Sequence, residues 1–262
     1  MLRALYTAAT GMQAQQINID TIANNIANVN TTGFKQGRAE FQDLLYQNIR
    51  PAGTSSSAST TYPVGLQLGL GTRPVATARI YSQGDFRQTG NPLDLVIEGK
   101  GFFQVRLPSG EVGYTRDGSL HVNAEGVVVT SDGYALEPQI TIPADAQTIV
   151  IGRDGTVSVT QAGQSAAQQV GTIQLATFQN PAGLNAVGGN LLLASTSSGD
   201  ATTGNATENG LGSINQGFLE QSNVSVVEEM VNMIVAQRAY EVNSRAMRVA
   251  DDMLQQVNGL VR

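Results

Sequence analysis

The chain has no cysteine and no tryptophan, and its 262 residues include a single histidine. Without cysteine it can form neither a disulfide framework nor a thiolate metal site. Charged residues make up only 14% of the sequence and leave a net charge of −6. A protein that binds a phosphate backbone needs a cationic surface, so this acidic balance argues against nucleic acid as a partner.

Long apolar runs are also missing. No stretch approaches the ~18 consecutive apolar residues that a membrane-spanning helix requires, so we expect no membrane insertion. Residues 1–6 contain one arginine and no small-residue cleavage pattern, unlike a secretory signal peptide. We therefore expect that, if the protein leaves the cytoplasm, it uses a route without a cleavable signal peptide.

Enzyme chemistry finds little support. His121 is the only imidazole and stands at a strand position, which is more typical of a surface residue than of a general base. Asp117 and Asp154 could be considered as paired carboxylates or cation ligands, yet each stands in an Asp-Gly turn that explains it without chemistry. Residues 99–103 (GKGFF) lack the rest of a phosphate-binding loop. We expect no catalytic residue, no cofactor, no metal site and no enzymatic activity.

Both ends of the chain carry apolar residues at seven-residue intervals, which is the pattern of helices that bury a seam against other helices. The pattern predicts one helix over residues 2–29. It predicts a second from about Ser225 to Leu260, opened by a Ser-x-x-Glu capping box. We expect the following residues at subunit interfaces: Leu5, Met12, Ile19, Ile22 and Ile26 in the first helix, Val226, Met233, Tyr240, Met247 and Leu254 in the second, and Val235, Val242, Val249 and Met253 on the opposite stripe of the second.

The second predicted helix is apolar on two faces, and one partner helix can cover only one of them. Exposed apolar patches of this kind usually mark an interaction surface, although a central domain that folds back over the helix is an alternative. The first helix is a poor helix former, because Gly11 and its asparagine and β-branched residues each cost up to ~1 kcal/mol relative to alanine. We expect it to be stable only when its apolar stripe is packed.

Residues 95–217 are typical of an antiparallel β domain, with short apolar runs bounded by Gly, Pro, Asn and Asp. The expected strands are residues 102–107, 126–130, 148–151, 156–159 and 172–178. Two related segments, RDGSLHV at 116–122 and RDGTVSV at 153–159, each place an Asp-Gly turn before an alternating strand. Two stretches rich in Ser, Thr, Ala and Gly, residues 53–61 and 195–212, are predicted to be loops that bury little on their own.

Four segments resemble the axial proteins of the bacterial flagellum, the family of rod and hook subunits. They are ANVNTTGFK at 27–35, GKGFFQV at 99–105, YTRDG at 114–118, and residues 222–256. Within that family, residues 43–76 are similar to distal rod subunits, with proximal rod and hook subunits as alternatives. An alternative from another class is a secreted β-rich adhesin or carbohydrate-binding module that uses the uncharged residues 155–199 as its binding face.

The resemblance implies an α+β fold, in which long N- and C-terminal helices pair as a coiled coil and a central antiparallel all-β domain lies outside them. The expected organisation is residues 1–42 as the N-terminal helix of the inner domain, 43–85 as an extended connecting segment, 86–221 as the β-rich outer domain, and 222–262 as the C-terminal helix.

The resemblance to the flagellar axial proteins also implies a function. It implies a structural subunit that polymerises into a rigid hollow shaft, transmits motor torque to the hook and lets exported subunits pass. The expected location is the flagellar basal body across the periplasm. The implied partners are further copies of the chain, other rod subunits, the hook protein, the periplasmic and outer-membrane ring proteins and the type III flagellar export apparatus. The residues expected to stiffen the shaft are Tyr46, Ile49, Pro51, Leu66, Leu68, Arg73 and Pro74.

Overall fold

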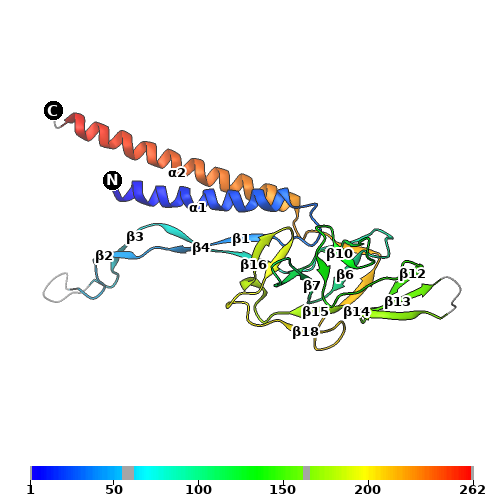
Figure 1. Ribbon diagram of the computed structural model, residues 1–262. Helices are drawn as coiled ribbons and strands as arrows, with labels where there is room; N and C mark the ends of the chain where they lie inside the picture. Colours follow the sequence, from blue (N-terminus) through cyan, green and yellow to red (C-terminus); the bar gives the residue numbers. More distant parts are fainter. Residues whose placement is uncertain (1, 55–61, 162–165, 261–262) are drawn as a thin grey trace. The chain divides into compact units, whose positions relative to one another are not determined.

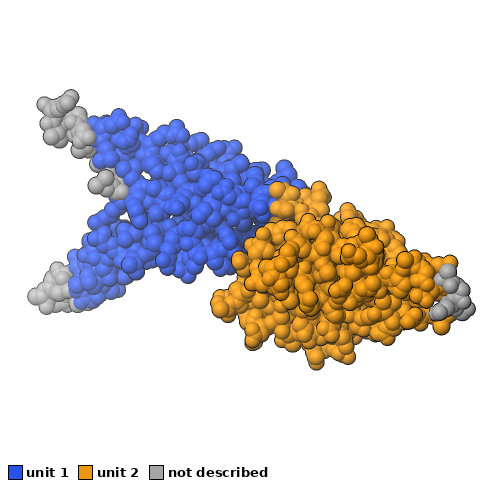
Figure 2. Space-filling view, in the orientation of Figure 1, with its two compact units in different colours: residues 1–26, 37–78, 225–262 blue, residues 27–36, 79–224 orange. Residues whose placement is uncertain are grey.

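The computed structural model describes all residues except 1, 55–61, 162–165 and 261–262. The chain divides into two compact units. The first comprises residues 1–26, 37–78 and 225–262, and the second comprises residues 27–36 and 79–224 (Figure 2). Each unit thus gathers segments that are far apart in the sequence, and each is described separately below.

The first unit contains the two terminal helices, which pack together. Helix α1 spans Leu2–Ala27 and helix α2 spans Val226–Leu260 (Figure 1). The start of α2 directly after Ser225 agrees with the predicted capping box, and α1 ends two residues before the predicted Val29. Helix α1 ends where the sequence supplies stop signals: the Thr31 amide donates to the Asn28 carbonyl at 3.2 Å.

The helices run antiparallel in a constant register. The Asn25 side-chain amide donates to Glu229 Oε1 at 3.2 Å, and an added Cβ at Gly11 would lie 2.9 Å from Asn243 Nδ2. These two contacts are fourteen residues apart on both helices (11 to 25, and 229 to 243), which is two seven-residue repeats. The α+β class with paired terminal helices is therefore confirmed.

Residues 37–78 form two antiparallel strand pairs in the same unit as the helices. Strand β1 (Gly37–Asp43) pairs with β4 (Thr72–Arg79), and β2 (Tyr46–Arg50) pairs with β3 (Leu66–Gly69). The pair β1–β4 is joined to α1, because the Thr72 amide donates to Thr10 Oγ1 at 3.4 Å. The expected connecting segment, residues 43–85, thus contains β2, β3 and β4, and as far as residue 78 these strands belong to the same unit as the helices.

The second unit is built around an antiparallel sheet that has nine strands in the described part of the chain. Seven of them follow the order β16-β17-β8-β7-β11-β10-β9, while β15 pairs with both β7 and β18. The strands of this sheet are β7 (Phe102–Arg106), β8 (Val112–Thr115), β9 (Leu120–Val122), β10 (Val128–Thr130), β11 (Ala135–Leu136), β15 (Gln174–Thr177), β16 (Asn185–Gly188), β17 (Leu191–Leu193) and β18 (Thr202–Asn205).

Smaller strand groups complete this unit. They are the sheet β12 (Ala146–Ile151), β13 (Thr156–Gln161) and β14 (Gln168–Thr172), the pair β6 (Leu95–Glu98) and β19 (Ser213–Gln216), and the pair β5 (Phe86–Gln88) and β20 (Phe218–Glu220). A short 3₁₀ helix spans Pro181–Gly183. The core is apolar, with Leu95, Phe103, Leu175 and Ile214 fully buried. The strands expected from the sequence are all present, and in both RDG segments the Asp side chain accepts the amide two residues on, at 3.0 and 3.1 Å.

One prediction for this unit is wrong. Residues 195–212 were predicted to be a loop that buries little on its own, yet they contain β18, and Ala206 and Leu211 lie in the core. The reason is tertiary, because β15 pairs with the backbone of Thr202–Asn205 and the other core residues cover Ala206 and Leu211. Most of the other predicted loop, residues 53–61, lies outside the described residues. No helix in the described part of the chain is long and apolar enough to cross a membrane.

Candidate assembly surfaces and a buried charge cluster

Exposed large apolar side chains are concentrated in the first unit. Among the described residues, 19 of the 23 large apolar side chains that are exposed belong to it, and only Phe86, Val122, Val150 and Val187 belong to the other unit. Water-exposed apolar surface on this scale is unusual for a protein that works alone. Ten of these side chains lie on α2 and four on the strand pair β2–β3, while the other five are Tyr6, Phe41, Leu45, Val64 and Val75.

The exposed region on α2 includes the second of the two predicted stripes. Val235, Val242 and Val249 are 62%, 63% and 56% exposed, and Met253 is 44% exposed. We call Val235, Val242 and Val249, which recur every seven residues, the valine stripe of α2. Other exposed apolar residues on this helix are Val226, Val227, Met230, Val231, Ile234 and Tyr240.

The two α1–α2 contacts described above, Asn25 with Glu229 and Gly11 with Asn243, involve small and polar residues. Glu229, Ala236 and Ala250 are each 2% exposed, and with half-buried Asn243 they recur every seven residues. The predicted residues of the first α2 stripe, Met233, Met247 and Leu254, are half-buried, as are Leu5, Met12, Ile19 and Ile26 of α1, whereas Ile22 is buried. All of these large residues are therefore less buried than Glu229, Ala236 and Ala250.

Sequence reasoning missed these contacts because it looked for large apolar side chains. The available signal was the seven-residue spacing of Gly11, Asn18 and Asn25 on α1, which matches that of the small and polar residues on α2. Small residues at such positions allow two helix backbones to approach closely. Gly11 does so opposite Asn243, since any side chain at residue 11 would press on the Asn243 amide.

The second exposed region is the strand pair β2–β3. Its apolar residues Tyr46, Ile49, Leu66 and Leu68 are between 41% and 57% exposed, and the other predicted stiffening residues, Pro51, Arg73 and Pro74, are exposed as well. An isolated two-stranded ribbon is marginally stable in water. We therefore expect this ribbon to be stabilised when another surface covers it.

The second unit contains a cluster of buried charges, formed by Lys35, Arg116 and Glu220. Lys35 Nζ lies 2.5 Å from Glu220 Oε1, and Arg116 Nε lies 3.7 Å from Glu220 Oε2. All three side chains are almost fully removed from water. Burial lowers the pKa of the Lys35 ammonium group, an effect that the Glu220 carboxylate partly offsets, and burial likewise lowers the pKa of Arg116.

Backbone groups satisfy much of the remaining hydrogen-bonding capacity of this cluster. Lys35 Nζ also donates to the Ser82 carbonyl at 2.7 Å, and the Gly84 amide donates to Glu220 Oε1 at 3.0 Å. Arg116 Nη2 donates to the Gly99 carbonyl at 2.7 Å. A buried charge is tolerated only when it is paired and hydrogen-bonded in this way, so the cluster fixes the segments that carry it.

The cluster lies where the sequence motifs meet. Lys35 ends the ANVNTTGFK segment, Arg116 is the arginine of YTRDG, and Glu220 stands two residues before the C-terminal segment 222–256. Gly33 of the first motif has a φ of +68°, and a Cβ there would lie 2.7 Å from the Arg116 carbonyl carbon. The sequence analysis did not predict this cluster. The feature that could have indicated it is that all three charged residues stand in or beside recognised motifs, in a chain with few charged residues.

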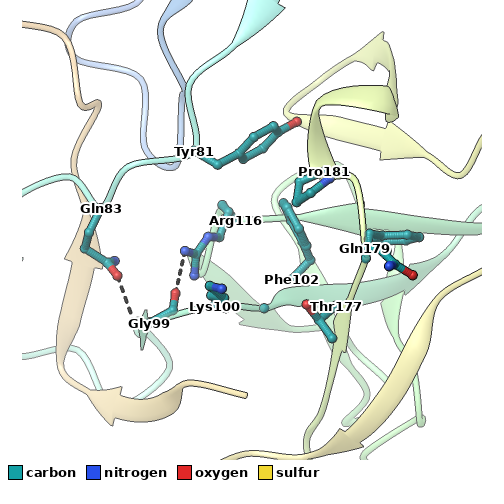
Figure 3. Close-up of a pocket in the computed structure, with 11 residues that line it drawn as sticks. Tyr81, Gln83, Gly99, Lys100, Phe102, Arg116, Thr177, Gln179 and Pro181 are labelled. Carbon is teal, nitrogen blue, oxygen red and sulfur yellow. Dashed lines mark hydrogen bonds between the residues drawn. The ribbon is translucent and has the colours of Figure 1, made fainter. Parts of the chain in front are cut away.

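A pocket of about 350 Å³ lies beside Arg116 (Figure 3). Its walls include Tyr81, Phe102 and Phe178, and the Tyr81 ring meets Phe102 edge-to-face with ring centroids 5.6 Å apart. Arg116 and Gln83 both hydrogen-bond Gly99 at its edge (Figure 3). The guanidinium group is thus engaged with backbone carbonyls, and the pocket is bordered by packed aromatic rings.

The residues considered for enzyme chemistry occupy ordinary structural positions. His121 is exposed on β9. Asp117 accepts from the Ser119 amide and hydroxyl, and Asp154 accepts from the Thr156 amide and hydroxyl. No group of three or more His, Cys, Asp or Glu that could hold a metal ion occurs among the described residues.

Comparisons with known proteins place the chain in a class. Three family models match it: a flagella basal body rod protein model over residues 5–35, a flagellar hook protein FlgE/F/G D1 domain model over residues 96–159, and a flagellar basal body rod FlgEFG protein C-terminal model over residues 215–260. The matched segments include most of α1, all of α2 and part of the core of the β unit. The class is that of flagellar rod and hook proteins.

Curated relatives narrow the class. The flagellar basal-body rod protein FlgG of Caulobacter vibrioides is 50% identical over 99% of both chains, and that of Borreliella burgdorferi is 48% identical over the full length of both. The flagellar hook-basal body complex protein FlhP of Bacillus subtilis is 30% identical over 99% of this chain. The chain belongs to the FlgG family of flagellar basal-body rod proteins, which are structural proteins of the bacterial flagellum. These matches do not favour the adhesin or carbohydrate-binding alternative.

Proposed function

We propose that the chain is a distal rod subunit that polymerises with further copies of itself into a rigid hollow shaft. The shaft transmits motor torque to the hook and leaves a channel for exported subunits. The observation that carries the proposal is the exposed valine stripe of α2, because the single chain leaves these side chains in water. Burying a valine side chain contributes roughly 1.5–3 kcal/mol, so covering the stripe in each subunit favours the polymer.

In this proposal the terminal helices form the inner domain of the shaft and the β unit forms its outer domain. The predicted interface residues of α1 and α2 contact different neighbouring copies, which spreads torsional load over many close-packed contacts. The β2–β3 ribbon fits between subunits and limits their sliding. Rod subunits on one side and hook protein on the other are the partners along the shaft axis, and ring proteins surround it.

The proposed location is the basal body across the periplasm, reached through the type III flagellar export apparatus without a cleavable signal peptide. Support comes from the relatives, which are named as basal-body rod proteins. Export can be tested directly, by following secretion of the full chain in cells with and without that apparatus.

The assembly proposal can be tested with a single substitution that introduces a charge into the valine stripe. Val242 is 63% exposed, so Val242→Lys leaves the fold of the single chain intact while placing a charge in the centre of the proposed contact. We expect this variant to lose polymerisation, measured by sedimentation, and to keep the helical circular dichroism of the wild type. Gln237→Lys, on another exposed face of α2, is the matched control. Polymerisation of Val242→Lys at the wild-type level would contradict the proposal.

A further inference from the structure

The backbone passes between the two compact units at four places, after residues 26, 36, 78 and 224. Torque or bending load that one unit receives can reach the other through these covalent crossings. Near three of them stand Gln36, Ile80 and Asn223, each one or two residues from its crossing and all within the second unit. The contacts among these three residues are therefore of particular interest.

Asn223 joins all three crossing segments with its side-chain amide. Its Oδ1 accepts from the Gln36 amide at 2.7 Å, and its Nδ2 donates to the Ile80 carbonyl at 2.9 Å. Nδ2 also donates to Ser82 Oγ at 2.9 Å. The other two segments are also bonded to each other, because the Ile80 amide donates to the Gln36 carbonyl at 2.8 Å.

The buried charge cluster secures the same segments a few residues further into the unit. Lys35, next to Gln36, reaches Glu220 and the Ser82 carbonyl, and the Gly84 amide reaches Glu220. Residues 27–36, which run between the first two crossings, are attached at a second point, since the Gly33 amide donates to the Glu220 carbonyl at 2.9 Å. Lys35 and Asn223 thus each bond two other crossing segments, and of the two side chains Asn223 is the uncharged one and stands one residue before its crossing.

We propose that Asn223 is a positioning residue that binds the crossing segments into one connection, so that the two units move relative to each other less freely than separate peptide links would allow. An asparagine is suited to this, because its side chain offers an acceptor and two donors on one planar group. Three segments that are bonded to one another resist bending and twisting better than three that move independently. The inference concerns the single chain and does not depend on the proposed polymer.

The test uses the full chain at single-molecule concentration, where assembly does not occur. Because the sequence has no cysteine, the pair Gln13→Cys and Ser109→Cys carries two dyes, one in each unit. We expect Asn223→Ala to broaden the distribution of energy-transfer efficiency between the dyes. We also expect amide hydrogen exchange at Gln36 to accelerate about tenfold, because each lost hydrogen bond is worth on the order of 1 kcal/mol.

Two further variants make the outcome decisive. Asn223→Asp keeps the acceptor for Gln36 but loses the donors to Ile80 and Ser82, so we expect it to broaden the distribution too. Asn123→Ala removes a comparable side chain that accepts two amides in a turn of the same unit, and we expect wild-type width. The proposal is overturned if Asn223→Ala accelerates exchange at Gln36 and leaves the distribution unchanged, or if it accelerates exchange throughout the β core, as a general loss of stability would.

Discussion

The side-chain amide of Asn25 on α1 donates to Glu229 Oε1 on α2 at 3.2 Å, which joins two residues that are 204 positions apart in the sequence. Asn25 simultaneously binds β1, since its Nδ2 donates to the Gly37 carbonyl at 2.8 Å and its Oδ1 accepts from the Gly37 amide at 2.9 Å. One side chain thus connects three elements of the helical unit. It lies in the last turn of α1, opposite the first turn of α2.

Replacing Asn25 is therefore expected to destabilise the helical unit. Asn25→Ala removes three hydrogen bonds, which together contribute about 2–4 kcal/mol to the free energy of unfolding. Glu229→Gln keeps an oxygen acceptor and is expected to cost much less. The measurement is urea unfolding followed by helical circular dichroism, with exposed Gln13→Ala as the control. A loss from Asn25→Ala no larger than that from Gln13→Ala would show that Asn25 does not hold the helices together.

The buried charge cluster predicts an unusual order of stabilities. Glu220→Met leaves Lys35 and Arg116 buried without their shared anion, which is expected to cost about 3–5 kcal/mol. Lys35→Met costs less, roughly 1–3 kcal/mol, because Arg116 and the Gly84 amide still face the carboxylate. The double variant should be more stable than Glu220→Met alone, since it removes one uncompensated cation. Denaturant unfolding of all three variants measures this order, and a double variant below both single variants would contradict it.

Low pH is expected to reduce the stability of the second unit, because Glu98 becomes protonated. A hydrogen bond from Asn215, helped by Arg153, holds the pKa of Glu98 below its ordinary value of 4.5. A carboxylate whose pKa is lowered by folding stabilises the fold fully above its unfolded value. That contribution is lost as the pH falls below 4.5 and through the lowered pKa.

The Glu98→Gln variant is accordingly predicted to have a lower melting temperature than the wild type at pH 7. At pH 3 the two melting temperatures are expected to be nearly equal. The difference is small because Glu98 is exposed, and high salt reduces it further. Asn215→Ala removes the first cause of the shift and should weaken the same pH dependence. A stability difference between Glu98→Gln and the wild type that stays constant from pH 7 to pH 3 would exclude this explanation.

The β2–β3 ribbon is predicted to stiffen the assembled shaft. The Leu44 amide donates to the Gly71 carbonyl at 2.8 Å just outside the ribbon, so residues 46–69 can be replaced by a two-residue Asn-Gly turn that suits an antiparallel connection. We expect this variant to assemble and to bend more easily, measured by the persistence length of shafts in electron micrographs.

A finer version of this experiment changes the surface of the ribbon only. Leu66→Ser with Leu68→Ser removes its exposed apolar side chains, whereas Gln67→Ser between them serves as the control. Shafts of the double variant should be more flexible and shafts of the control should be like the wild type. An unchanged persistence length after removal of the whole ribbon would rule out a stiffening role.

The charges of the buried cluster illustrate what sequence reasoning could not reach. Lys35 and Glu220 are 185 positions apart, and no local pattern connects them. Their segments were recognised as motifs, yet the motifs alone did not show that three charges converge. The pairing of α1 with α2 could not be predicted for a different reason. Large apolar residues and small or polar residues both recur every seven positions on α2. Periodicity alone cannot say which stripe faces the partner helix.

The sequence by itself determined the two terminal helices, the strands between them and the α+β class, because helix and strand periods are local properties of neighbouring side chains. It also carried the motifs that identify the family. Only the tertiary structure decided that the described α1–α2 contacts involve small and polar residues, that residues 37–78 join the helical unit, and that residues 195–212 enter the β core. Each of these depends on contacts between distant segments, where close approach and the satisfaction of buried polar groups outweigh local preference.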